Sequence, residues 1–195
     1  MSNFYFDTEF HEYFVKYNGK MIPTIDLISI GIVDENNKKF YKICKDHNLE
    51  DSWSDVWLKE NVFHQIYNEL VPVSARDNLV FCFSTMVFLF KTYGITRKEI
   101  AEQILSFIGK DKTPEFYGYY SAYDHVSLCW LFGKMKNLPK HFPMLTIDLK
   151  QMMIERGLDS KWKETNCPDP ESEHSALSDC LWNKKLYDEI IKSKK

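Results

Sequence analysis

The chain has 195 residues, of which 44% are hydrophobic and 15% aromatic, and its net charge at pH 7 is -3. A chain of this length and apolar content can bury a core, which argues against intrinsic disorder. The small negative charge predicts no strong general attraction to nucleic acids or membranes.

The N-terminal third is predicted to form strands. Residues 4–10, FYFDTEF, are aromatic and free of Gly and Pro, and residues 25–33 are apolar and β-branched. Asn18-Gly19 and the polar run 34–37 are turn signals, and residues 40–44 complete a three-stranded antiparallel meander.

The middle of the chain is predicted to be helical. Residues 54–70 place apolar side chains near helical spacing. Residues 96–109 begin with a capping box, Thr96 to Glu99, and end at a glycine. Between them, the apolar stretch at about 75–95 is interpreted as a buried helix in an enlarged core, with an apolar dimer surface as the alternative.

The last third alternates strands and helices. Residues 114–123 are predicted to form a strand that leads directly into a helix, with Asp124 at the junction. A short strand and helix end at Gly157, the polar residues 159–173 are predicted to be a loop, and the rest suits a packed helix. The fold class is therefore α/β, a mixed sheet flanked by helices, in a single domain over residues 1–195 with a helical elaboration at about 75–95. The tryptophans are expected to lie mostly in the core: Trp53, Trp57, Trp130, Trp162 and Trp182.

Two acids on the first strand need a positive partner. Side chains alternate along a strand, so Asp7 and Glu9 point to the same side, and the neighbouring phenylalanines suggest that this side is half-buried. Asp124 and Asp179 also lie near predicted helix starts, and no Arg or Lys lies nearby in the sequence. Converging carboxylates call for a hard divalent cation, Mg²⁺ or Mn²⁺, and two such ions could clamp a phosphodiester.

His174 is the candidate general base. It precedes Asp179 by five residues, which is about 140° around a helix, so the two cannot share a helical face. His174 is therefore predicted to lie before the helix, where an imidazole that titrates near neutrality could deprotonate water. A capping or surface role is the ordinary alternative.

The predicted substrate contacts surround the acids. Thr8 lies between the two strand acids, and Phe10 could stack on a terminal base, although a core position for Phe10 is equally expected. Tyr123 and His125 flank Asp124 and are predicted to face the nucleotide.

Three motifs carry a family resemblance. FDTEF, the Asp124 segment YSAYDHVSL and HSALSD resemble the three motifs of the DEDD exonucleases, and His174 with serine at position 175 resembles the histidine (DEDDh) subgroup. DTEF, IDLISIGIV, VWLKENV and AYDHVSLCWLFGKM also echo, in order, the RNase AS family of polyadenylate-preferring 3′-to-5′ exoribonucleases.

The resemblance implies an RNase H-like (DnaQ-like exonuclease) fold and hydrolysis of single-stranded RNA from its 3′ end to nucleoside 5′-monophosphates. It further implies two Mg²⁺ ions, replaceable by Mn²⁺, a homodimer, and His174 as general base. The acids that would hold the metal are Asp7, Glu9, Asp124 and Asp179.

Location and alternative functions complete the expectations. Five scattered cysteines, no signal-peptide pattern and no bilayer-length apolar run predict a cytoplasmic protein that does not enter membranes. The alternative functions are a 3′-to-5′ DNA exonuclease of the proofreading type and a catalytically silent RNA-binding protein.

Overall fold

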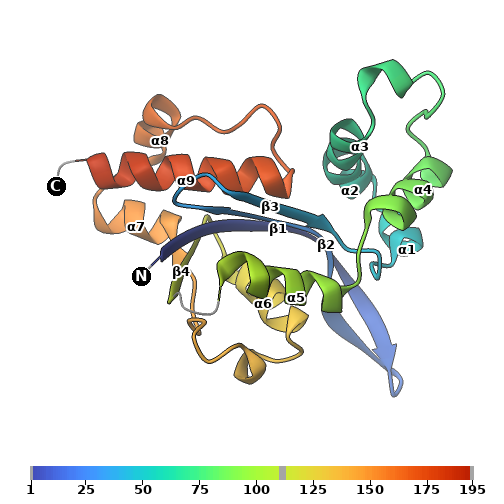
Figure 1. The fold of residues 1–195 in the computed structure, drawn as a ribbon, viewed down its shortest axis with the longest axis horizontal. Helices are drawn as coiled ribbons and strands as arrows, with labels where there is room; N and C mark the ends of the chain where they lie inside the picture. Colours follow the sequence, from blue (N-terminus) through green and yellow to red (C-terminus); the bar gives the residue numbers. More distant parts are fainter. Residues whose placement is uncertain (1, 110–112, 194–195) are drawn as a thin grey trace.

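The computed structural model describes residues 2–109 and 113–193, and Figure 1 shows their arrangement. Five strands in this part of the chain form one sheet in the order β3-β2-β1-β4-β5. β2 pairs antiparallel with β1 and β3, whereas β4 pairs parallel with β1 and β5. The strands are β1 (Ser2–Tyr17), β2 (Lys20–Asp34), β3 (Lys39–Ile43), β4 (Pro114–Gly118) and β5 (Ile147–Asp148).

Helices cover both faces of the sheet. Helices α7 and α9 pack on one face and α5 and α6 on the other, while α1 to α4 form a group at one end (Figure 1). The α-helices are α1 (Leu49–Trp53), α2 (Val56–Leu58), α3 (His64–Leu70), α4 (Phe83–Tyr93), α5 (Arg97–Ile108), α6 (Ala122–Leu131), α7 (Leu149–Glu155), α8 (Ser160–Asn166) and α9 (Ala176–Lys192). The other helical turns are the π-helix η1 (Lys59–Phe63) and the 3₁₀ turns η2 (Val73–Ala75) and η3 (Met135–Asn137).

Buried apolar residues in the described part of the chain form three clusters, two of which lie on opposite sides of β1. Phe4 and Phe6 point into the layer under α5 and α6, and Tyr5 points into the layer under α7 and α9. Three antiparallel strands followed by two parallel ones, with helices on both faces, make an RNase H-like fold of the DnaQ-like exonuclease type. The predicted α/β fold class is confirmed.

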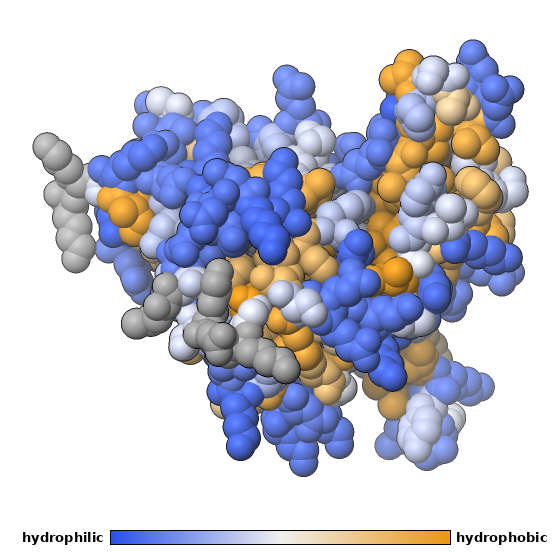
Figure 2. Space-filling view, in the orientation of Figure 1, coloured by the Kyte–Doolittle hydropathy of each residue, from blue (hydrophilic) through white to orange (hydrophobic). Residues whose placement is uncertain are grey.

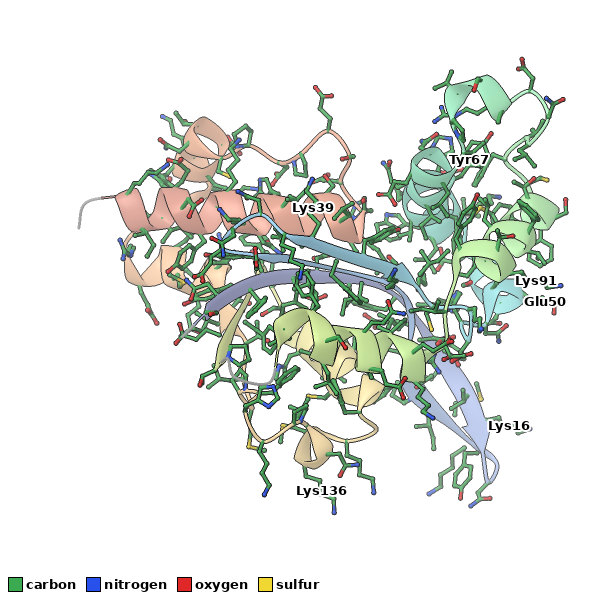
Figure 3. All side chains as sticks on the ribbon, viewed as in Figure 1. Lys16, Lys39, Glu50, Tyr67, Lys91 and Lys136 are labelled. Atoms are coloured by element: carbon green, nitrogen blue, oxygen red, sulfur yellow. The ribbon has the colours of Figure 1, made fainter. Side chains whose placement is uncertain are left out.

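The first two strands extend well beyond the predicted meander. β1 and β2 stay paired as far as Tyr17 and Lys20, and Asn18 and Gly19 close the hairpin with φ values of 48° and 78°. Both residues therefore adopt the left-handed conformation that this tight turn requires. The far end of the hairpin projects from the body and carries Lys16 (Figures 1 and 3).

Three sequence predictions need correction. The predicted loop 159–173 contains α8, whose N-cap Asp159 accepts a 2.7 Å hydrogen bond from the Trp162 amide. The predicted strand 114–123 ends at Gly118, and the lack of a side chain there lets the turn before α6 pass close by, because a Cβ would lie 2.7 Å from the Ser121 Cβ. Two of the tryptophans are not core residues: Trp57 is 52% exposed and Trp130 is 47% exposed.

The apolar stretch at about 75–95 forms a helix only from Phe83 onward. One side of α4 packs Met86, Leu89 and Phe90 against α2 and α3. The other side leaves apolar residues in solvent, and Figure 2 shows apolar surface over this end of the molecule. None of the helices described is both long enough and apolar enough to span a bilayer.

Candidate active site

The edge of β1 is open where its two acids lie. β4 pairs with β1 only over Ser2–Tyr5, so the strand has no neighbour on that side from the next residues onward. Asp7 and Glu9 follow at this point, at the C-terminal end of β4. A crevice at the carboxyl end of a parallel strand is a common ligand site in open α/β sheets.

Helix α9 brings the third acid to this edge. Gly31 pairs with Asp7 in the sheet, and a Cβ on Gly31 would lie only 2.1 Å from the Ala176 carbonyl oxygen. Asn183 also donates a 3.0 Å hydrogen bond to the Phe6 carbonyl. Because the glycine lets the first turn of α9 lie directly on the sheet, Asp179 comes within reach of the strand acids.

These three acids form one cluster. Asp7, Glu9 and Asp179 each offer a carboxylate oxygen, and the three oxygens lie within 4.8 Å of one another. Glu9 is buried, while the other two are partly exposed. The sequence prediction that Asp7 and Glu9 share a side is confirmed by this geometry.

Asp124 joins the cluster through β1. It lies in the first turn of α6 and is 6% exposed. Its Oδ1 accepts a 2.9 Å hydrogen bond from the Thr8 amide and a 2.6 Å hydrogen bond from the Thr8 hydroxyl. Thr8 therefore fixes the Asp124 carboxylate beside the strand acids, a role that the sequence did not reveal.

His174 lies just before α9, as predicted. Ser175 is the N-cap, and His174 has φ 65°, a left-handed conformation that is uncommon for a residue with a side chain. Its amide donates a 2.9 Å hydrogen bond to Asp179 Oδ2. The imidazole and the Trp57 ring form a T-shaped contact, with centroids 4.7 Å apart.

A second contact fixes the residue next to His174. The Ser175 hydroxyl donates a short hydrogen bond to the carboxylate of Glu69 on α3. Helices α2 and α3 therefore hold both the side chain of His174 and the backbone that follows it. Trp57 and Glu69 lie more than a hundred residues away in the sequence, so no local pattern linked them to His174.

Burial disfavours the charged form of all four acids. Burial, followed by the charge of Asp179, raises the pKa of Glu9 to about 8. Burial likewise raises the pKa of Asp179 to about 7 and that of Asp124 to about 6. Burial and then the charge of Asp124 raise the pKa of Asp7 well above its usual value.

No Lys or Arg in residues 2–109 and 113–193 forms an ion pair with any of these four acids. A divalent cation would supply the missing positive charge. The donors are all carboxylate oxygens, which suit Mg²⁺ or Mn²⁺ better than softer metals. The residues present therefore fit a hard divalent ion.

The acids and His174 open onto two cavities. The larger, of about 420 Å³, also contains Thr8, Phe10 and Trp57. The other, of about 340 Å³, shares Asp7, His174 and Asp179 with the first and extends toward Tyr120 and Lys163. The cluster thus lies where the two cavities meet.

The predicted substrate contacts are only partly brought together. Phe10 lines the larger cavity, and its ring stacks on Tyr123 with centroids 5.6 Å apart. His125 does not line that cavity; its Nδ1 hydrogen-bonds the Thr146 hydroxyl at 3.0 Å. The cavity also has lining residues that the sequence gave no reason to select: His11, Glu12, Asp55, Trp57 and Leu58.

The chain is similar to curated exoribonucleases. No protein-family model matches it. It is 29% identical over 180 residues to the 3'-5' exoribonuclease Rv2179c of Mycobacterium tuberculosis strain H37Rv, an alignment that covers 90% of this chain and 85% of the relative. The 3'-5' exoribonuclease MT2234.1 of strain CDC 1551 matches with the same figures.

Proposed function

We propose that this protein is a metal-dependent 3′-to-5′ exoribonuclease of the DEDDh type that releases nucleoside 5′-monophosphates from single-stranded RNA. The observation that carries the proposal is the cluster of Asp7, Glu9 and Asp179 within 4.8 Å, with no cationic partner in the described residues and with His174 on the same cavity. The two relatives named 3'-5' exoribonuclease support the same reaction.

The acids would hold two divalent ions, Mg²⁺ or Mn²⁺. Asp7, Glu9 and Asp179 would bind one ion, and Asp7 with Asp124 would serve the second. When bound, the ions would supply positive charge that stabilises the negative charge on the scissile phosphodiester in the transition state. Thr8 would keep Asp124 in place through its two hydrogen bonds to Oδ1.

His174 would act as the general base. A neutral imidazole can accept the proton of the attacking water and release it to solvent. Its position at the junction of the two cavities supports this role, because water and the 3′ end of a strand can both reach it there. The Trp57 contact and the Asp179 hydrogen bond would hold the ring and its backbone in position.

Phe10 would hold the terminal base. One face of its ring stacks on Tyr123, and Phe10 lines the cavity that contains the acids. A base stacked on an aromatic ring contributes about 1–3 kcal/mol to binding, largely without regard to sequence. This pair supports single-stranded rather than paired RNA as the substrate.

Finer properties rest on the sequence resemblance to the RNase AS family. We propose that the protein prefers RNA with adenylates at its 3′ end and that it forms a homodimer. We also propose that the chain is one catalytic domain, to which helices α1 to α4 are an addition. Free thiols at all five cysteines support a reducing compartment such as the cytoplasm. Base preference is measured by comparing kcat/KM on oligo(A) and oligo(U). The oligomeric state is measured as the molar mass by light scattering during size-exclusion chromatography.

The test is hydrolysis of 5′-labelled oligo(A) and oligo(dA) with Mg²⁺, with Mn²⁺ and with EDTA. The proposal predicts a ladder that shortens from the 3′ end of RNA, needs a divalent ion and is lost in the His174→Ala variant. Cleavage of oligo(dA) alone would indicate a DNA exonuclease. Binding without cleavage of either strand would indicate a silent RNA-binding protein and would overturn the proposal.

A further inference from the structure

We propose that a separate cavity, the Trp130 cavity, binds an upstream base of the same RNA strand whose 3′ end lies at the acids. This inference rests on the proposed exoribonuclease function. The cavity has a volume of about 310 Å³ and lies between the β1–β2 hairpin, α5 and α6. The lining residues that carry the argument are Tyr13, Asp26, Arg97, Ser127 and Trp130.

Two aromatic side chains from different elements line this cavity. Tyr13 comes from the hairpin and Trp130 from the exposed side of α6. Trp130 is 47% exposed, whereas Leu128 and Leu131 of the same helix are buried in the core. Exposed aromatic rings beside a groove are the usual means of binding unpaired bases, because every base has a face that can stack.

The polar groups suit a heteroaromatic ring better than a hydrocarbon. Ser127 is 4% exposed, and its hydroxyl has no hydrogen-bond partner among the residues described. Arg97 pairs with the buried Asp26, yet the Arg97 side chain remains 40% exposed and lines the cavity. A base carries ring nitrogens and exocyclic groups that can pair with a hydroxyl, and its phosphate can pair with a guanidinium.

The Trp130 cavity and the larger cavity at the acids, called the acidic cavity below, are both lined by residues of β1 and α6. On β1, Phe10 lines the acidic cavity and Tyr13 lines the Trp130 cavity, a spacing of about 10 Å at strand rise. On α6, Asp124 and Trp130 are separated by about 9 Å along the helix axis. The Phe10–Tyr123 stack bridges the hairpin and α6 near the acids. An unstacked strand with its end at the acids can therefore reach the Trp130 cavity within a few nucleotides.

The test is a scan of RNA octamers that each lack one base. Each 5′-fluorescein-labelled oligo(A) octamer carries a single abasic residue at a different position from the 3′ end. Dissociation constants are measured by fluorescence anisotropy with Mg²⁺ in the His174→Ala background, so that the strand is not consumed. The same series is repeated with Trp130→Ala and, as a control, with Tyr17→Ala, which removes an exposed aromatic residue of the hairpin that does not line the cavity.

The proposal predicts one interior position where base removal weakens binding about tenfold. In Trp130→Ala that position-specific penalty disappears, while the penalty at the terminal base remains and Tyr17→Ala retains both. If Trp130→Ala leaves the interior penalty unchanged, or if no interior position shows one, the inference is overturned.

Two further outcomes also overturn it. If Trp130→Ala converts a dimer to a monomer in sedimentation and weakens binding equally at all positions, a second copy of the chain occupies the cavity instead. If Trp130→Ala changes only the penalty for removing the terminal base, the Trp130 cavity is not a separate binding site. Because the readout is binding, these outcomes are distinguishable from failure of the proposed function, which is a loss of cleavage.

Discussion

Replacing Gly31 with alanine should separate α9 from the sheet and damage the candidate active site without touching any acid. The new Cβ would lie 2.1 Å from the Ala176 carbonyl oxygen, 2.5 Å from its carbon and 2.9 Å from the Leu177 nitrogen. All three are backbone atoms, so no side chain can rotate away. To restore a separation of 3.0 Å from the oxygen, the backbones must move apart by about 0.9 Å.

The magnitude follows from two effects. Overpacking of a buried contact typically costs about 1–3 kcal/mol, which for a chain of this size lowers Tm by about 2–12 °C. A displacement of roughly 1 Å at reacting groups can cost about a hundredfold in rate. Asp179 lies one turn from the point of contact, so we expect kcat/KM to fall by about that factor.

The assay compares Gly31→Ala with Ile104→Val, a truncation in the opposite layer of the core that costs about 0.5–1.5 kcal/mol. Both variants are measured on the labelled oligo(A) substrate at a temperature where both are folded. We expect Ile104→Val to keep nearly wild-type kcat/KM. Wild-type kcat/KM in a folded Gly31→Ala would refute the argument that this glycine sets the position of Asp179.

Three further predictions concern the acids, His174 and the exposed thiol. Asp7→Asn should raise Tm in EDTA by relieving repulsion in the cluster and abolish the stabilisation by Mg²⁺ in a thermal shift assay; an unchanged Mg²⁺ response would contradict the metal assignment. Trp57→Ala should lower kcat by about tenfold with little change in KM, because the His174 ring loses a contact that positions it, and Trp57→Phe, which keeps an aromatic contact, should restore most of the lost kcat. Hydrogen bonds with Ser84 and Thr85 lower the pKa of Cys82 to about 7, so the rate of its alkylation by iodoacetamide should reach half its maximum near that pH; a midpoint near 9, or no shift in Ser84→Ala, would contradict this.

Local signals in the sequence located much of the fold. The Thr96–Glu99 capping box, the Asn18-Gly19 turn and the alternation around Asp7 each depend on neighbouring residues, and each is found as predicted. The position of His174 ahead of α9 followed from helix geometry alone.

Features that depend on distant residues were not predictable. The seven residues of α8 carry too little periodicity to mark a helix, and their Asp159 cap looks like an ordinary loop acid. The far half of the hairpin is held by cross-strand pairing and is exposed, so its sequence lacks the pattern of buried apolar residues from which a strand is predicted. Composition also cannot tell which tryptophans face solvent, and Trp57 and Trp130 were therefore misplaced.

The sequence also could not reveal how the site is held in place. The hydrogen bond from Thr8 to Asp124 joins residues that are 116 positions apart in the sequence, and the one from Ser175 to Glu69 joins residues that are 106 positions apart. The larger cavity at the acids likewise arises only when β1, α2, α6 and α9 meet. Motifs identified the acids, and the packing of remote elements determines what surrounds them.

The central claim is tested most directly by identifying the first nucleotide released from an RNA octamer with seven adenylates and a single uridylate at its 3′ end. We predict that mass spectrometry will detect uridine 5′-monophosphate first, only with Mg²⁺ or Mn²⁺, and not with Asp7→Asn. Adenosine nucleotides released first, uridine released with its phosphate left on the strand, or equal cleavage in EDTA would contradict a metal-dependent 3′-to-5′ exoribonuclease.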